Sequence, residues 1–104
     1  MEKQDVLSAL AALAQETRLD VFRRLVQAGL SGLPAGELAS ELSISPATLS
    51  FHLKELRNAR LVTSEREGRS IRYAPDFLVI GALVAYLGEN CCRDTCGGPA
   101  AAAG

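Results

Sequence analysis

The sequence predicts a mainly α-helical domain with one small β-hairpin, and therefore a fold of the α+β class. Three observations support this prediction. Apolar residues recur at helical spacing in several segments before residue 60, Ser45 and Pro46 form a strong helix start, and segments 61–66 and 70–73 look like two strands around a glycine-containing turn. A chain of 104 residues, 48% of them hydrophobic, is the size of one small domain.

Three helices are expected ahead of residue 45. The first covers about 5–14, the second runs from about 17 to 28 and ends at Gly29, and the third opens at 33–34 and reaches about residue 42. The first helix is indicated by Val6, Leu7, Leu10, Leu13 and Ala14. The residues expected to face inward are Leu19, Phe22, Leu25 and Val26 in the second helix and Leu38, Ala39 and Leu42 in the third.

The fourth helix is predicted to have one packed face and one free face. Ser45 is a favourable N-cap, and Pro46 suits the first helical position. The apolar stripe consists of Leu49, Leu53 and Leu56, and the opposite side carries Ala47, Phe51, Lys54 and Asn58. A tight turn at 43–45 joins this helix to the short helix before it. Two helices joined in this way are typical of a helix-turn-helix, whose second helix enters the major groove of DNA.

The predicted hairpin carries a concentration of arginine. Its turn at 67–69 needs the permissive backbone of Gly68. Arg66, Arg69 and Arg72 lie on or beside this wing, where guanidinium groups can reach a phosphate or the minor groove. Residues 45–74 carry six basic and three acidic side chains, although the net charge of the whole chain is −1. Such a patch can dock on phosphates, and a solvated surface of mixed charge is the alternative.

The last predicted helix, at about 76–90, has no polar face between Phe77 and Gly88. A helix that is apolar all round must be covered on all sides, and a monomer of this size can hardly cover it. We therefore expect a homodimer interface formed by the first and last helices, with a central core helix as the alternative. This uncharged run of twelve residues is too short to cross a bilayer, which needs about 20. Since the N-terminus also lacks a secretory pattern, a cytoplasmic protein with no membrane partner is expected.

The free face of the fourth helix and the wing are predicted to contact DNA. Direct contacts to bases are assigned to Ala47, Thr48, Ser50 and Phe51. Phe51 can pack on a thymine methyl group, with a partner-protein contact as the alternative. Contacts to phosphates are assigned to Lys54, Arg57, Arg66, Arg69 and Arg72, of which Arg69 is the best candidate for the minor groove. His52 lies on the flank of the apolar stripe, which favours a structural or phosphate-contacting role over catalysis, and the chain is predicted not to be an enzyme.

Four segments, in order, resemble the ArsR family of small bacterial winged-helix repressors. They are 13–19 (LAQETRL), 37–45 (ELASELSIS), 48–56 (TLSFHLKEL) and 66–73 (REGRSIRY), spread over the region 5–90. The resemblance implies a homodimer that sits on an operator and leaves it when an ion binds. Two of the family's ion sites are missing, because 34–36 reads Pro-Ala-Gly in place of Cys-x-Cys, and because 76–89 contains no histidine. The segment Glu89-Asn-Cys-Cys92 resembles the arsenic-sensing branch, whose ligands lie just beyond the last helix.

All three cysteines, Cys91, Cys92 and Cys96, fall within six positions of the tail. We therefore divide the chain into a DNA-binding and dimerisation domain at 1–90 and an inducer-binding tail at 91–104. Thiolates select soft acceptors, and three sulfurs suit trivalent arsenic or antimony better than zinc, which prefers four ligands. Neighbouring helical residues differ by about 100° in direction, so the tail must leave helical geometry for Cys91 and Cys92 to act together.

The first hypothesis, based on these cysteines, is a repressor that responds to As(III) or Sb(III) and has no permanent cofactor. The inducer in this hypothesis is arsenite, methylarsenite or antimonite, and methylarsenite needs only two thiols. A second hypothesis is a redox regulator in which two thiols form a disulfide. A third is a structural or protein-interaction module that senses nothing.

Overall fold

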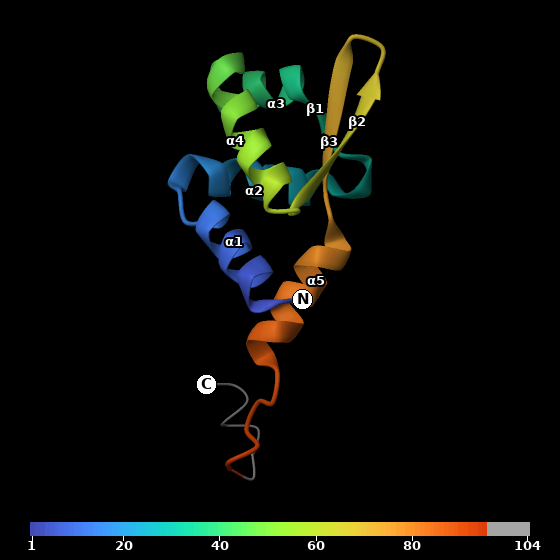
Figure 1. Cartoon of the computed structure of the whole chain (residues 1–104). Coiled ribbons are helices and arrows are strands. Elements are labelled where there is room, and N and C mark those ends of the chain that lie inside the picture. Colours follow the sequence, from blue (N-terminus) through green and yellow to red (C-terminus); the bar gives the residue numbers. More distant parts are fainter. Residues whose placement is uncertain (96–104) are drawn as a thin grey trace.

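The computed structural model describes residues 1–95, which form five α-helices, one 3-10 helix and one small antiparallel sheet (Figure 1). The α+β prediction is therefore confirmed. In chain order the elements are α1 (Lys3–Leu13), α2 (Glu16–Ala28), η1 (Gly29–Ser31), β1 (Leu33–Pro34), α3 (Ala35–Leu42), α4 (Pro46–Asn58), β2 (Val62–Glu67), β3 (Ser70–Pro75) and α5 (Phe77–Gly88).

The helix-turn-helix is formed by α3 and α4, and the signals that predicted it are present. Ser43 closes α3 in the left-handed conformation with φ of 54°. Ser45 then caps α4, because its hydroxyl accepts a hydrogen bond from the backbone N–H of Thr48 at 3.2 Å. The first helix and the last helix lie within two residues of their predicted bounds, and Gly29 ends α2 with φ of 79°, as expected.

The sheet has the strand order β1-β3-β2, so β3 lies in the middle. Pairing of Glu67 with Ser70 leaves Gly68, with φ of 62°, and Arg69 in the turn of the wing, which we define as β2, β3 and this turn. The prediction that 33–34 opens the third helix is wrong, because Leu33 pairs with Tyr73 as a short edge strand. A side chain at Gly32 would stand 2.1 Å from the Tyr73 carbonyl oxygen, so only glycine lets β1 approach β3 here.

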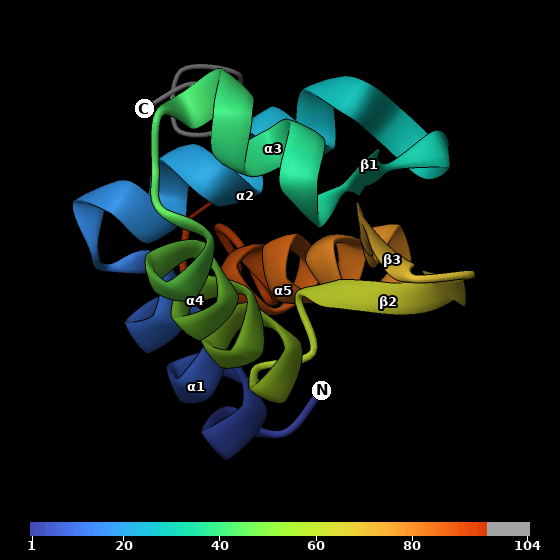
Figure 2. The same ribbon diagram turned by 90° about the horizontal axis from the view of Figure 1, so that it is seen from above.

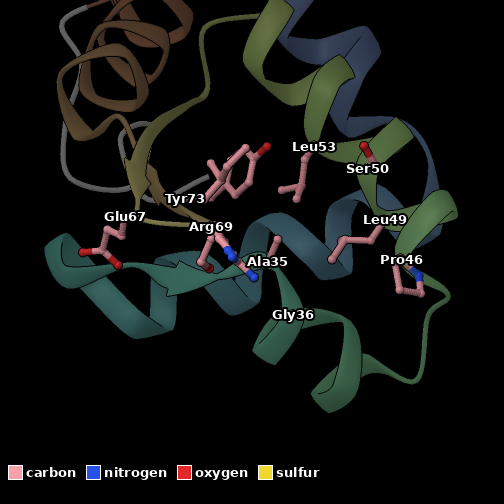
Figure 3. A pocket seen from close by; sticks show the side chains of 11 residues that line it. Ala35, Gly36, Pro46, Leu49, Ser50, Leu53, Glu67, Arg69 and Tyr73 are labelled. Atoms are coloured by element: carbon pink, nitrogen blue, oxygen red, sulfur yellow. The ribbon is translucent and has the colours of Figure 1, made fainter.

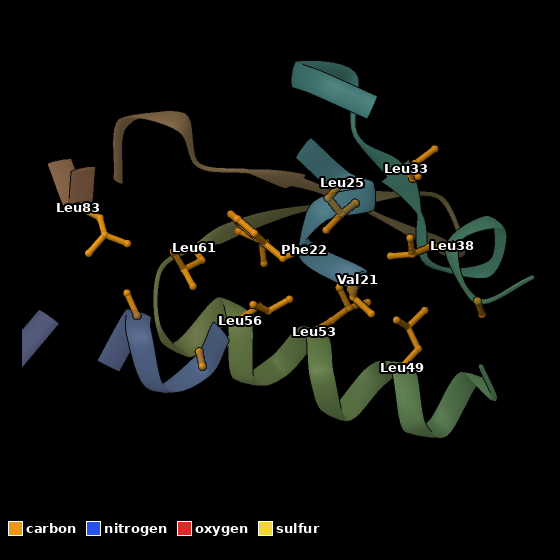
Figure 4. Close-up of a cluster of buried hydrophobic side chains, with 14 of the residues drawn as sticks. Val21, Phe22, Leu25, Leu33, Leu38, Leu49, Leu53, Leu56, Leu61 and Leu83 are labelled. Carbon is orange, nitrogen blue, oxygen red and sulfur yellow. The ribbon is translucent and has the colours of Figure 1, made fainter. Parts of the chain in front are cut away.

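The hydrophobic core lies between α2, α4 and the base of the wing (Figure 4). The predicted α4 stripe is confirmed, since its three leucines are almost completely buried. In α2 the prediction was partly wrong: Phe22 and Leu25 are buried, but Leu19 and Val26 are exposed and Val21 takes their place. Contacts of α2 with both α4 and β3 turn Val21 inward, and a pattern within one helix does not specify which neighbours it meets.

Helix α5 projects from the end of the molecule opposite the wing tip and the start of α4 (Figure 1). Leu83 is its only buried residue, whereas Leu78 is 87%, Val84 65% and Leu87 61% exposed. A central core helix is therefore excluded within the single chain. Residues 1–95 contain no helix long and apolar enough to span a membrane.

Candidate nucleic-acid interface and cysteine pair

The outer face of α4 and the wing lie side by side on one side of the molecule (Figure 2). The residues predicted to contact bases, Ala47, Thr48, Ser50 and Phe51, are all exposed. Phe51 is the largest of them, and 55% of its surface is accessible. An exposed aromatic ring beside small polar side chains near the start of the second helix suits contact with base edges in a major groove.

The cations around this face differ in how freely they can reach a phosphate. Lys54, Arg66 and Arg69 are exposed. Arg57 is also exposed, but it donates a hydrogen bond from Nη1 to the Ser64 hydroxyl on β2 at 3.2 Å. This bond holds the guanidinium between α4 and the wing and uses only one of its five N–H groups.

A groove of about 560 Å³ separates α4 from the wing (Figure 3). Its floor is largely apolar and includes Leu49, Leu53 and Tyr73. Arg69 comes from the turn of the wing and points into the groove toward the start of α3. The guanidinium predicted for the minor groove therefore points inward between α4 and the wing, and contact with DNA would require it to swing outward.

Arg72 does not fit its predicted role as a phosphate contact. Its Nε donates to Glu67 at 2.9 Å, and its Nη1 donates to the carbonyl oxygens of Ser31 and Gly32 at 3.0 and 3.2 Å. The guanidinium thus joins the wing to the loop before β1. Sequence spacing grouped Arg72 with Arg66 and Arg69 as phosphate contacts. It could not reveal β1 and the loop before it, whose carbonyl oxygens accept hydrogen bonds from Arg72.

His52 also differs from its predicted place among the DNA contacts, because only 7% of its surface is accessible. Its Nδ1 accepts a hydrogen bond from Arg18 Nε at 3.4 Å. Burial, together with the neighbouring Arg18 charge, lowers the pKa of His52 below its ordinary value of 6.5. Of the two roles predicted for this residue, the structure favours the structural one.

Sequence reasoning did not single out Arg18, although the structure places it against both His52 and Phe51 of α4. It is the third residue of α2, where a cation faces the positive end of the helix dipole. A basic side chain in the first turn is unfavourable by itself, which indicates a partner elsewhere in the fold. That signal was present in the sequence, but it did not identify the partner.

The cysteine pair lies just beyond α5. The chain leaves helical geometry after Gly88, and Asn90 and Cys92 adopt positive φ angles of 61° and 66°. The expected departure from the helix is therefore present, and the structure joins Cys91 to Cys92 as a disulfide pair. Cys96 lies outside the described residues. Within residues 1–95 no cluster of three or more His, Cys, Asp or Glu side chains is arranged to hold a metal ion.

Comparisons with known proteins agree with this geometry. Residues 13–65 match the family model described as a helix-turn-helix domain. The chain is 33% identical to the transcriptional activator HlyU of Vibrio cholerae over 95 residues, covering 89% of this chain and 85% of HlyU. It is 40% identical to the transcriptional regulator CmtR of Mycobacterium tuberculosis over 83 residues, covering 79% and 68% of the two chains.

Solved structures extend the likeness to the whole winged fold. An ArsR-like transcriptional regulator from Rhodococcus sp. RHA1 is 31% identical, with a TM-score of 0.71 over 81% of this chain and 76% of that one. Reduced HlyU from Vibrio cholerae is 30% identical, with a TM-score of 0.66 over 90% and 92%. Since the helix-turn-helix, the wing and the order of elements agree as well, the chain belongs to the ArsR family of winged-helix transcriptional regulators.

Proposed function

We propose that this chain is a homodimeric repressor that leaves its operator DNA when trivalent arsenic binds Cys91, Cys92 and Cys96. The observation that carries the proposal is the position of Cys91 and Cys92. Their sulfur atoms lie together immediately beyond α5, the helix that the single chain leaves largely exposed. A ligand held at this point can act on the dimer interface without touching the DNA-binding face.

The proposed dimer rests on exposed apolar surface. Leu7 and Leu10 of α1 are exposed, as are Leu78, Val84 and Leu87 of α5. Helices α1 and α5 contact each other, so these side chains belong to one region of the molecule. Burial of large apolar side chains stabilises an assembly by about 1.5–3 kcal/mol for each one that is fully covered, and a second copy supplies a matching surface.

The donor set fits trivalent arsenic in its chemistry. Once a thiol reductant has opened the Cys91–Cys92 disulfide, three thiols can replace the three hydroxyl groups of arsenite, with release of three water molecules, and the product is neutral. No charge then has to be buried at the end of α5. Cys91 and Cys92 supply two of the three sulfurs and can serve methylarsenite by themselves, and antimonite has the same preference for sulfur.

The tail residues can couple this ligand to DNA through the dimer. Bringing the three thiols together would fix the chain just beyond α5 and change the end of that helix. A change at α5 alters the spacing of the two α4 helices in a dimer, because α4 and α5 of each copy pack on the same hydrophobic core. A coupling free energy of about 1–3 kcal/mol would lower operator affinity roughly 5- to 150-fold.

A redox regulator of the same fold is the second candidate. The pairing of Cys91 with Cys92 as a disulfide favours it, because Cys91 is exposed and Cys92 half-buried, so the reduced pair would be open to oxidants. The relative HlyU has been solved in a reduced form, which is compatible with a redox-dependent member of the family. In this case peroxide, rather than arsenite, would release the DNA.

Fluorescence anisotropy with a labelled duplex selected from a random library separates the two candidates. Arsenite, antimonite, zinc, cadmium and, without reductant, peroxide are added separately. We expect arsenite to release the wild-type protein and the Thr95→Ser control, whereas Cys91→Ser, Cys92→Ser and Cys96→Ser each stay bound. Release of the triple serine variant by arsenite would contradict the proposal, and release by peroxide alone would favour the redox candidate.

A further inference from the structure

We propose that Arg18 is a positioning residue for DNA recognition, because its guanidinium joins the end of α1 to the DNA-facing side of α4 and fixes the Phe51 ring. The inference goes beyond the proposed inducer and requires only that α4 reads DNA. Three elements meet at this side chain: α1 through Ala12, α2 through Arg18 itself, and α4 through His52 and Phe51.

Arg18 uses two of the five N–H groups of its guanidinium in hydrogen bonds to other elements. Its Nη1 donates to the carbonyl oxygen of Ala12 at 3.3 Å, near the C-terminal end of α1, where carbonyl oxygens lack helical partners. Its Nε donates to Nδ1 of His52 at 3.4 Å. Both acceptors belong to buried residues, so the guanidinium is anchored from the inner side of the molecule.

The same guanidinium also contacts the outer side of α4. Its central carbon lies 5.6 Å from the centroid of the Phe51 ring, within the range of a cation–π contact. The Phe51 and His52 rings meet edge to face, with centroids 5.5 Å apart and an interplanar angle of 61°. Phe51 is therefore held from two directions, although more than half of its surface is exposed.

This arrangement favours a defined ring orientation before DNA arrives. An exposed phenylalanine on a helix can occupy more than one rotamer, and fixing it on binding costs conformational entropy. A ring already held by Arg18 and His52 avoids part of that cost, which is the benefit of preorganisation. The bond from Arg18 to Nδ1 of His52 requires a neutral imidazole with its proton on Nε2, a form in which the two residues do not repel each other.

A direct phosphate contact by Arg18 is the competing explanation, and the salt dependence of binding distinguishes the two. Loss of a phosphate contact reduces the slope of log affinity against log salt by about 0.9, whereas loss of a positioning residue leaves the slope unchanged. The selected duplex is therefore titrated with wild type, Arg18→Ala, Arg18→Gln and Arg18→Lys at several salt concentrations. Arg23→Ala removes an exposed arginine from the same helix and serves as the matched control.

We expect Arg18→Ala and Arg18→Gln to bind roughly 5- to 30-fold more weakly with an unchanged salt slope, since the cation–π contact is lost in both and the two hydrogen bonds of the guanidinium are lost or weakened. Arg18→Lys keeps a positive charge but lacks the fork of N–H groups that serves two acceptors at once, so we expect it to bind more weakly than wild type as well. Arg23→Ala should stay within about twofold of wild type. In a double-mutant cycle, Arg18→Ala should add less than about a twofold further loss to Phe51→Ala, because the ring it positions is already gone.

Four outcomes would overturn the inference. A smaller salt slope in Arg18→Ala would make Arg18 a phosphate contact. Full affinity in Arg18→Lys would show that charge suffices without the guanidinium geometry, and additive losses in the cycle would separate Arg18 from Phe51. If circular dichroism shows that Arg18→Ala does not fold, Arg18→Gln and Arg18→Lys are used for the test.

These titrations contain no inducer, so their outcome does not depend on the proposed function. A missing response to arsenite would overturn only the proposed function. A wild-type protein that selects no duplex would overturn the inference about Arg18.

Discussion

Helices α4 and α5 have nearly the same length but opposite relations to the core. Only one side of α4 is apolar, and its three leucines are nearly completely buried, while the other side faces solvent. In α5 almost every residue is apolar, yet Leu83 alone is buried. The comparison teaches that the positions of apolar residues around a helix, rather than their number, determine whether a single chain can bury its apolar surface. The surplus apolar surface of α5 is available to a second copy.

The largest expected effect is the loss of the dimer on charging the outer face of α5. Val84→Glu combined with Leu87→Glu would bury four unpaired carboxylates in the proposed interface, two from each copy. Because each buried unpaired charge costs several kcal/mol, we expect the dimer dissociation constant to rise more than about 1000-fold. Analytical ultracentrifugation across a dilution series measures this change.

Leu30→Glu provides the control for that experiment. Leu30 lies on η1 and is 84% exposed, so it is as accessible as the α5 residues but belongs to another surface. Its substitution should leave the sedimentation coefficient unchanged. Dissociation by Leu30→Glu, or an intact dimer in the α5 double variant, would place the interface elsewhere.

A second prediction distinguishes the roles of α4 and α5 by how the free energy of unfolding of their variants depends on protein concentration. Leu53→Ala in α4 removes a buried side chain and should lower the free energy of unfolding by about 2–5 kcal/mol at every protein concentration. Leu87→Ala in α5 should cost less, and its effect should depend on concentration because the contact lies between copies. Urea denaturation at two concentrations tests both. An effect of Leu87→Ala that is independent of concentration would contradict the comparison.

Local signals explain why the helix-turn-helix could be predicted from the sequence. The Ser45 cap, Pro46 and the leucine stripe specify the start and the inner face of α4 without reference to other elements. Gly68 similarly specifies the turn of the wing, and the runs on either side specify its strands. These features depend on residues that are close in the chain, which is where sequence patterns are most informative.

Contacts between distant segments explain the features that could not be predicted. Strand β1 forms because Gly32 meets Tyr73, about forty positions later in the chain. Arg72 was assigned to DNA because its partners, the Ser31 and Gly32 carbonyl oxygens, belong to that same unpredicted loop. A phosphate contact stayed open for His52, beside a structural role, because its partner Arg18 lies on another helix. Helical spacing alone predicts on which side of a helix a residue lies, but not which residues of other elements it contacts.

The wing offers a third prediction, in which two arginines on one hairpin behave differently. Arg69→Ala should weaken DNA binding and reduce its salt slope by about 0.9, with little change in stability. Arg72→Ala should lower the free energy of unfolding by about 1 kcal/mol, because it loses two bonds to carbonyl oxygens and a partly exposed ion pair. Its salt slope should remain that of wild type. A reduced slope in Arg72→Ala would return this residue to the phosphate contacts.

The smallest expected effect is a pH dependence of stability that arises from His52, the buried histidine of α4. Burial and Arg18 hold the pKa of His52 below its ordinary value of 6.5 in the folded protein. As the pH falls through this value, the unfolded chain therefore takes up the proton before the folded protein does. The contribution of neutral His52 to stability is complete well above pH 6.5 and is lost as the solution is acidified.

His52→Asn isolates this contribution because His52 is the only histidine in the chain. We expect the difference in free energy of unfolding, wild type minus variant, to be constant above about pH 7.5 and to decrease steadily toward about pH 5.5. Denaturation curves at each pH measure it, with the same buffer series applied to Arg18→Gln. Removing the neighbouring positive charge should raise the pKa of His52 and make the decrease smaller, whereas an increase in the difference at low pH would show that His52 is charged in the folded protein.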